Sequence, residues 1–189
     1  MGAFKFEQRP AMYFADFVLY PLVIVGGMAV LIEYAHGSVG ALLAAAVLGF
    51  LSWSLVEYAL HRFVLHGLPP FKHWHETHHE RPFALIGSST PVSMTAFAAL
   101  VFWPLSAVTG PWIALAATLG MTLGYLLYVT VHHATHHWRA RPGSWMQARK
   151  RDHARHHRPG AEGWYGVTTP FWDRVFGTDG SAGESSGKP

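Results

Sequence analysis

The chain has 189 residues, of which half are hydrophobic and only 13% are charged, and its formal net charge is +3. Soluble globular domains carry about 25% charged residues, so this balance favours a membrane protein over a soluble one. The sequence contains no cysteine, which excludes disulfides and thiolate metal sites. The modest net charge gives no reason to expect a nucleic-acid partner.

Four apolar stretches have the composition of membrane spans, and a span takes about 20 mostly apolar residues. The third stretch is short and contains Pro104, so a tilted or re-entrant half of a hairpin is the alternative reading for it. The fold class that follows is all-α, an integral membrane four-helix bundle. We expect the spans at Ala11–Ala35, Val39–Leu60, Val92–Val108 and Trp112–Val131.

The basic residues give this bundle an orientation. With four spans, all 14 Lys and Arg lie in the N-terminus, the middle loop and the tail, and the loops at 36–38 and 109–111 contain none. Loops rich in Lys and Arg remain in the cytoplasm. We therefore expect residues 61–91 and 132–177 to form a cytoplasmic cap, with both termini also on the cytoplasmic side of a bacterial inner membrane. Residues 1–177 then form a single domain, and the Gly/Ser-rich residues 178–189 form a disordered tail.

The cap is also expected to be helical. One helix should follow Pro69–Pro70 and end before Arg81–Pro82. Ser144 and Gln147 form a capping box, and the helix that they begin should stop at Pro159–Gly160. Thr169–Pro170 should begin a short helix that Gly177 closes.

Histidine is the unusual component, with 14 residues that are mostly clustered. Residues at i, i+3 and i+4 share one helix face, so HETHH and HARHH can each direct three imidazoles one way. His61 and His66 are about 140° apart on an α-helix, so the helix has to end or bend near His66. The clusters are His61 and His66; His75, His78 and His79; His132 to His137 in HHATHH; and His153, His156 and His157.

With one pair taken from HHATHH, the clusters supply ten imidazoles in the cytoplasmic cap, which exceed the needs of one metal ion and suit two ions with about five nitrogens each. Imidazole binds zinc, copper, iron and nickel, so ligand type leaves the metal open. Within HHATHH, both His132 with His136 and His133 with His137 are i, i+4 pairs. His36 and His73 lie apart from the clusters, and we interpret them as polar residues at the membrane interface and not as metal ligands.

These motifs, with EYALHRFVLHG before them and GVTTPFWDRVFGT after them, resemble the fatty acid hydroxylase/sterol desaturase superfamily of membrane di-iron enzymes. The likeness covers about residues 55–178 and is strongest to bacterial fatty acid 2-hydroxylase-like proteins. It implies O2-dependent hydroxylation of a lipid by two iron ions, with zinc as a possible metal on isolation and two electrons from a separate donor. No catalytic residue beyond the metal ligands is implied. The implied ligands are His61, His66, His75, His78, His79, His132, His136, His153, His156 and His157.

Other readings of the same residues remain open. The same superfamily contains lipid desaturases and carotenoid hydroxylases, and a non-redox metal-binding or transport protein or a membrane metallohydrolase is a rival from another class. Several acidic residues are candidates for orienting the imidazoles, although a solvated or structural role is as good a reading for each of them. They are Glu57, Glu76, Glu80, Asp152 and Asp173, of which Asp173 is read as a cap of its short helix.

Overall fold

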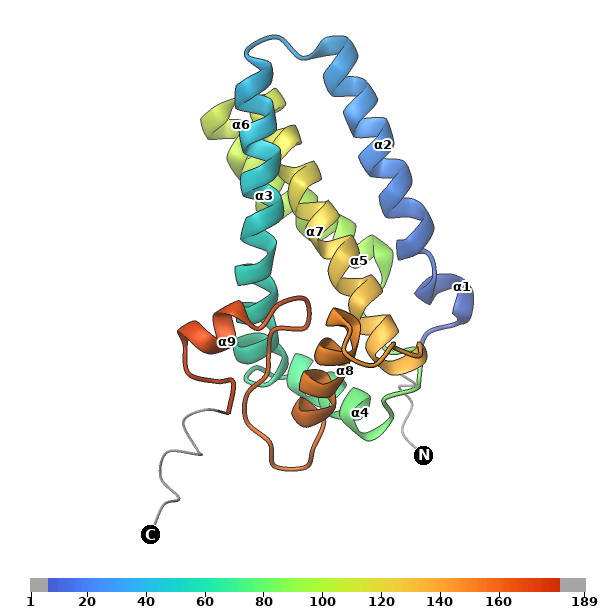
Figure 1. Cartoon of the computed structure of the whole chain (residues 1–189). Helices are drawn as coiled ribbons and strands as arrows, with labels where there is room; N and C mark the ends of the chain where they lie inside the picture. The colour runs from blue at the N-terminus through green and yellow to red at the C-terminus, as the bar shows by residue number, and fades with distance from the viewer. Residues whose placement is uncertain (1–6, 181–189) are drawn as a thin grey trace. The chain divides into compact units, whose positions relative to one another are not determined.

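The computed structural model of the protein describes residues 7–180, and the described part of the chain is helical (Figure 1). No strand occurs in these residues, and one isolated β-bridge pairs Glu7 with Ile86. The all-α prediction is confirmed here, whereas most of the predicted disordered tail lies outside the described residues. The chain divides into two compact units, residues 1–53 with 85–126 and residues 54–84 with 127–189.

Four helices have the length and apolarity to cross a membrane, with a mean hydropathy of 1.6 or 2.1 over their most apolar windows. The protein is therefore an integral membrane protein. These helices run from Pro10 to Tyr34, Val39 to Leu65, Thr90 to Thr109 and Pro111 to His137. Their segments are α1 (Pro10–Tyr13), α2 (Asp16–Tyr34), α3 (Val39–Ala59), η1 (Leu60–Leu65), α5 (Thr90–Ala96), η2 (Phe97–Phe102), α6 (Trp103–Thr109) and α7 (Pro111–His137).

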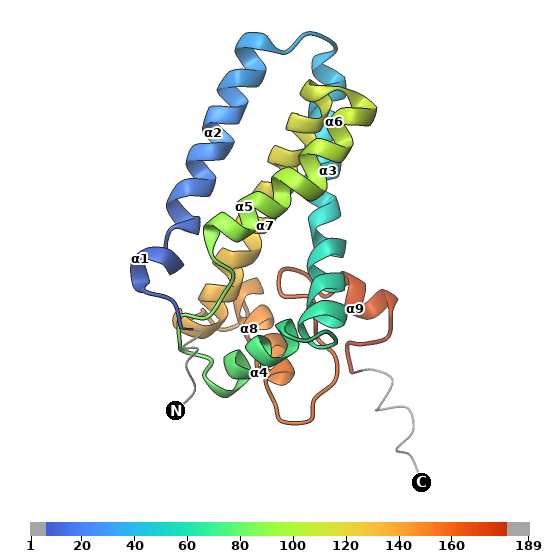
Figure 2. The same cartoon turned by 180° about the vertical axis from the view of Figure 1, so that it is seen from behind.

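The third helix accommodates its proline without breaking. The segments α5, η2 and α6 follow one another without a gap, and η2 is a π-helix that ends just before Trp103 and Pro104 (Figure 2). Proline has no amide hydrogen and its ring crowds the preceding turn, and a wider π turn relieves that crowding. The result is a helix of 20 residues, which is long enough to span.

The first unit has few buried side chains, and many of its apolar side chains face outwards. Ile32, Leu100 and Val108 are 83%, 75% and 85% exposed, as expected of helices that are solvated by lipid. Helices α3 and α7 approach closely through small residues: a Cβ at Gly49 would overlap the carbonyl of Ala117, and one at Gly120 would overlap that of Ala46. Close backbone approach at small residues is a common way for membrane helices to pack.

Polar and aromatic side chains also join the helices of the first unit. The rings of Phe97 and Tyr125 contact each other, and each also contacts the rings of Tyr20 and Trp53. Beside them the buried carboxylate of Asp16 accepts hydrogen bonds of 2.6 Å from the hydroxyls of Thr90 and Tyr125. These bonds connect α2, α5 and α7, because a buried carboxylate has to be hydrogen-bonded.

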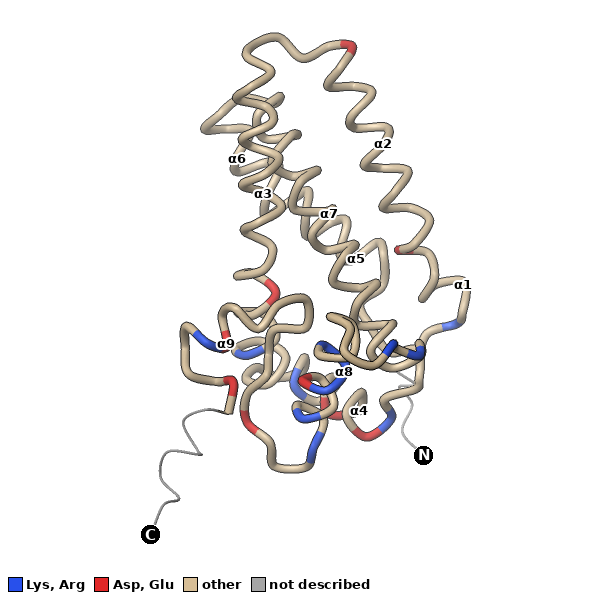
Figure 3. Tube along the Cα trace, viewed as in Figure 1, with Lys and Arg blue, Asp and Glu red and all other residues tan. Residues whose placement is uncertain are grey.

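The second unit contains the three short helices that the sequence predicts. They are α4 (Phe71–Glu80), α8 (Trp145–His156) and α9 (Phe171–Val175), and α4 lies beside α8 in both views (Figures 1 and 2). The predicted cap of α8 is confirmed, because the Ser144 hydroxyl accepts a hydrogen bond of 3.2 Å from the Gln147 amide. Every described Lys and Arg except Arg9 belongs to this unit (Figure 3).

Candidate metal centre

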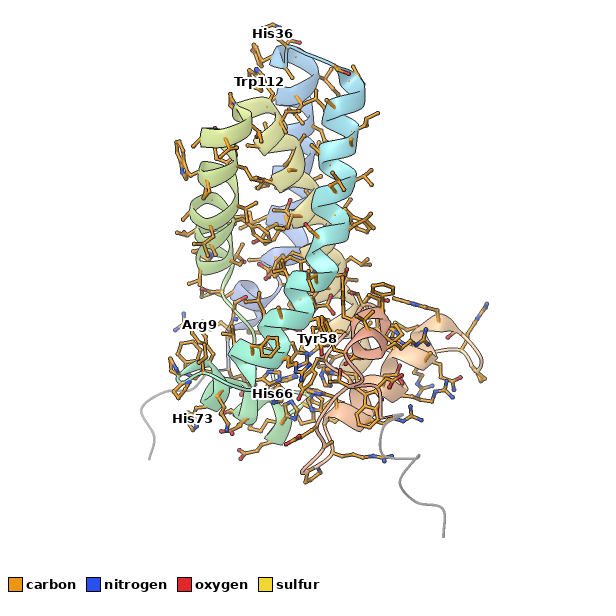
Figure 4. All side chains as sticks on the ribbon, turned by 90° about the vertical axis from the view of Figure 1, so that its left-hand side faces the viewer. Arg9, His36, Tyr58, His66, His73 and Trp112 are labelled. Carbon is orange, nitrogen blue, oxygen red and sulfur yellow. The ribbon has the colours of Figure 1, made fainter. Side chains whose placement is uncertain are left out.

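The structure gathers the clustered histidines within the second unit, where they form two groups of five. Within each group, one ring nitrogen from each histidine lies within 4.8 Å of those of the others. Figure 4 shows side-chain nitrogens gathered beside the labelled His66, with the labelled His73 apart from them. The first group is His61, His66, His75, His79 and His156, and the second group is His78, His132, His136, His153 and His157.

In the first group, the Nε2 atoms face one another at short range. His75 Nε2 lies 3.0 Å from that of His61 and 3.1 Å from that of His79. The Nε2 atoms of His66 and His156 are also 3.1 Å apart. His61 and His156 are 3% and 1% exposed, so their nitrogens are shielded from solvent, whereas His66 and His79 are half-buried.

The second group has the same arrangement. Nε2 of His132 lies 3.1 Å from Nε2 of His78, and Nε2 of His153 lies 2.8 Å from that of His136. Both ring nitrogens of His157 are buried and have no hydrogen-bond partner among the described residues. A buried polar atom without a hydrogen-bond partner destabilises the folded protein. A bound cation would provide the missing partner for a nitrogen of this kind.

The spacing of these nitrogens fits metal ligation. Imidazole nitrogens bind zinc at about 2.0–2.1 Å, and two ligands at right angles around such an ion are about 3.0 Å apart. The observed Nε2–Nε2 separations of 2.8–3.1 Å match that value. Five nitrogens in each group also match the two-ion arrangement expected from the sequence. The residues present thus fit a pair of metal ions, and the assignment of individual ligands is a proposal.

A π-helix brings His61 and His66 together. On an α-helix the two side chains would point in different directions, but Leu60–Leu65 forms η1, in which the His66 amide donates to the His61 carbonyl. This is the i→i+5 bond of a π turn. It places the two imidazoles with their centroids 5.2 Å apart, and the helix then ends at His66, as the sequence predicts.

Burial keeps the imidazoles neutral. Outside the spanning helices, desolvation lowers the pKa of His78 and His156 to about 3, that of His79 to about 4 and that of His157 to about 2. Neighbouring imidazoles add to the effect, since two positive rings in contact would repel. The pKa of His75 and that of His153 are lowered by the same two causes. Neutral rings offer a nitrogen lone pair, which metal binding requires.

Two imidazoles of the first group are oriented by backbone carbonyls. Nδ1 of His61 donates to the carbonyl of Tyr165 at 2.6 Å, and Nδ1 of His156 donates to that of Gly163 at 2.8 Å. A carbonyl can only accept, so the proton of each neutral ring is fixed on Nδ1. The lone pair is consequently on Nε2, which points into the group. Sequence reasoning missed Gly163 and Tyr165, because a backbone carbonyl has no residue-type signal.

Four histidines lie outside both groups. His133 and His137 stack on each other with ring centroids 4.4 Å apart, and neither belongs to a group. His73 is an exposed residue of α4. His36 lines a cavity of about 280 Å³ in the first unit, together with Trp112 and the residues of the loops around Gly37 and Gly110.

The acidic candidates divide into two kinds. Glu76 lies 3.9 Å from Lys72, and Asp152 pairs with Arg149 and Arg155, which are local ion pairs within α4 and α8. Glu80 is exposed at the end of α4. Glu57 and Asp173 are buried at 3% and 1% exposure. Asp173 lies in the first turn of α9, but its carboxylate accepts from the amides of Tyr165 and Gly166 instead of capping that helix.

Fold and site together define an integral membrane protein with a histidine-rich centre that could hold two metal ions. The model of the fatty acid hydroxylase family matches residues 46–178, and the chain belongs to that family. A solved structure described as full-length scs7p, with only its hydroxylase domain visible, superposes with a TM-score of 0.75 at 28% identity. This alignment covers 88% of the present chain and 66% of the other.

Curated relatives support the same family. The chain is 32% identical to the ceramide very long chain fatty acid hydroxylase scs7 of Schizosaccharomyces pombe, over 75% of this chain and 44% of that protein. It is 35% identical to the fatty acid 2-hydroxylase of Rattus norvegicus, over 70% and 38%. It is 32% identical to the dihydroceramide fatty acyl 2-hydroxylase FAH2 of Arabidopsis thaliana, over 69% and 58%. The chain thus spans less than two thirds of each of these relatives.

Proposed function

We propose that the protein is a membrane oxygenase that uses two iron ions and O2 to hydroxylate the acyl chain of a lipid. The observation that carries this proposal is the gathering of ten imidazoles into two groups of five nitrogens each. The names of the relatives support the reaction and the substrate class, because they describe hydroxylases of fatty acids and of ceramide acyl chains. Carbon 2 of the acyl chain is the proposed position.

The metal pair would supply the oxidising power needed to break an unactivated C–H bond, which side chains alone cannot do. The contribution of the protein is to hold that pair in a shielded and non-oxidisable set of ligands. Imidazole nitrogens meet this need, and the sequence has no cysteine that an oxidant could attack. The burial of His61, His78, His153 and His156 excludes water from the ligand nitrogens.

The proposed ligands are the ten histidines of the two groups. For the pair of histidines at the end of α7, His132 and His136 are preferred because both belong to the second group, whereas His133 and His137 do not. The proposed metal is iron, since hydroxylation with O2 requires a redox-active ion and zinc has no redox chemistry.

We also propose that the centre faces the cytoplasm, in a bacterial inner membrane, and receives electrons from a separate donor. The distribution of Lys and Arg supports the orientation. Hydroxylation with O2 consumes two electrons per turnover. Within the 189 residues there is no cysteine to bind an iron–sulfur cluster, which supports a donor outside this sequence.

The proposal is tested with the full chain, purified anaerobically in detergent and loaded with Fe(II). The protein is supplied with a chemical reductant, O2 and a ceramide or fatty acid with deuterium at carbon 2. The expected product gains one oxygen atom and loses one deuterium, as measured by mass spectrometry. A product that has lost two hydrogens would identify a desaturase instead. Tight zinc with no uptake of O2 would refute the proposed oxygenase.

A further inference from the structure

Two ligands of the first group depend on one short segment of the chain. We call residues 163–168 the carbonyl loop. Its Gly163 carbonyl accepts from Nδ1 of His156, and its Tyr165 carbonyl accepts from Nδ1 of His61. These two histidines come from different elements, α8 and η1, so the loop fixes the ring orientation of both at once.

The carbonyl loop has a conformation that needs external support. Gly163 has a φ of 122° and Trp164 has a φ of 53°. Residues other than glycine rarely adopt the left-handed value of Trp164. At Gly166, a Cβ would overlap the carbonyl of Thr169. A strained segment of this kind persists only where its surroundings hold it in place.

Glu57 is the first anchor of the loop. One carboxylate oxygen accepts from the amides of Val167 and Thr168, at 2.6 Å and 2.9 Å. The other oxygen accepts from the Thr168 hydroxyl at 2.6 Å. Glu57 thus forms three bonds with two adjacent residues, although 110 residues of sequence separate it from Val167.

Asp173 is the second anchor of the loop. Its Oδ1 accepts from the Tyr165 amide at 2.8 Å and from the Thr178 hydroxyl at 2.7 Å. Its Oδ2 accepts from the Gly166 amide at 2.7 Å. The two buried carboxylates together bind the four consecutive amides of residues 165–168, in the same segment as the two carbonyls that hold the imidazoles.

The second group lacks this support in the described part of the chain. Nδ1 of His78 and Nδ1 of His153 are buried and have no hydrogen-bond partner there. With no acceptor at Nδ1, nothing favours the tautomer that has its lone pair on Nε2. The first group is thus ordered for metal binding by the fold, whereas the second group depends more on the ion itself.

We propose that Glu57 and Asp173 are positioning residues that act through the carbonyl loop on the first metal position only. The two metal positions are consequently unequal, and the first binds its ion more tightly. This inference rests on the proposed two-metal centre. It gives two of the acids that the sequence offered as candidates for orienting the imidazoles an indirect route, through backbone carbonyls and without direct contact with a histidine.

The test measures each metal position separately, with Co(II) as the probe and the full chain in detergent. In an H132A background only the first group is intact, and in an H66A background only the second. Removal of an outer partner of a ligand weakens metal binding by about 10- to 100-fold. We expect at least about 10-fold tighter Co(II) binding in the H132A background than in the H66A background, by the same principle.

Glu57→Ala should weaken Co(II) binding by about 10-fold or more in the H132A background and leave it unchanged in the H66A background. Glu57→Gln should restore it, because the amide oxygen can accept from both loop amides and the amide nitrogen can donate to the Thr168 hydroxyl. Asp173→Asn, by contrast, should weaken Co(II) binding in the H132A background, since one of the two loop amides would face the donor nitrogen of the asparagine. Thr168→Val is a milder variant that removes one bond to Glu57 and should have a smaller effect in the same background.

Asp16→Ala is the matched control, because it removes a buried carboxylate that makes two hydrogen bonds within the first unit. It should leave both Co(II) affinities unchanged. Equal losses in the two backgrounds for Glu57→Ala and for Thr168→Val would show a merely structural role and overturn the inference, with the two-metal centre still standing. If neither background bound Co(II), the proposed centre itself would fail.

Discussion

Replacing one imidazole should remove one metal ion and leave the other. His156 and His78 are the sharpest sites, because they belong to different groups and are 1% and 4% exposed. In H156A the first group retains four nitrogens and loses the Nε2 that lies 3.1 Å from that of His66. The second group keeps all five nitrogens. We expect the iron content to fall from two equivalents to one, and H78A should give the converse loss.

The size of the effect follows from the position of the lost atom. Loss of an outer partner of a ligand already weakens metal binding by about 10- to 100-fold, so loss of the ligand itself should cost at least about 100-fold, or about 3 kcal/mol. Metal content is measured by elemental analysis after dialysis. The control is H73A, on the same helix as His78 but outside both groups. Two retained irons in H156A, or one lost iron in H73A, would refute the assignment.

Three further predictions test other features. Gly120→Ala should destabilise the protein by about 1–3 kcal/mol, because its Cβ would overlap the Ala46 backbone. Gly26→Ala, with open space around it, should be neutral or stabilising by up to about 1 kcal/mol. Unfolding in detergent compares the two variants, and equal stabilities would contradict the predicted packing. The metal-free protein should become less stable as the pH falls from about 6.5, because the unfolded chain then binds more protons than the folded one. In the folded protein, burial lowers the pKa of His78 and His156 to about 3 and that of His79 to about 4. A melting temperature that rises as the pH falls would contradict this prediction. In a chain that has no native cysteine, an impermeant thiol reagent added to intact cells should label Ser38→Cys and not Arg141→Cys, and the reverse pattern would invert the topology.

Local periodicity was enough to predict much of the architecture. The apolar lengths indicated four spans, and the observed helices begin within two residues of the predicted starts. Two of them continue further than expected, to Leu65 and to His137, because the histidine-bearing ends remain helical after the apolar residues stop. Caps and breakers were also informative, since Ser144 and Pro159 bracket α8. These features depend on residues that are close in sequence, where helix geometry is known in advance.

Features that depend on distant residues were not predictable. The π turn of η1 changes the angle between His61 and His66, and no residue in LHRFVL signals it. The carbonyl loop acts through backbone atoms, and its anchor Glu57 lies in a helix more than 100 residues earlier. The ending GVTTPFWDRVFGT supported the family resemblance, but its spacing did not indicate that Asp173 binds the loop.

The division of the histidine boxes indicates what would set the distance between the two proposed metal positions. The box on α4 gives His75 and His79 to the first group and His78 to the second, and the box on α8 gives His153 and His157 to the second and His156 to the first. Each group is completed by a pair from a single region, either His61 with His66 or His132 with His136. Every group is therefore a pair, an i, i+4 pair and a single residue.

Two helices thus contribute to both of the proposed metal positions. His75 and His78 have ring centroids 5.6 Å apart, and those of His153 and His156 are 5.9 Å apart. These values are close to the pitch of an α-helix, about 5.4 Å. Because a helical turn is stiff, neither position can shift along α4 or α8 without the other. Chemistry that needs two ions to act together on one O2 requires such a fixed separation, and the His-x-x-His-His spacing provides it twice.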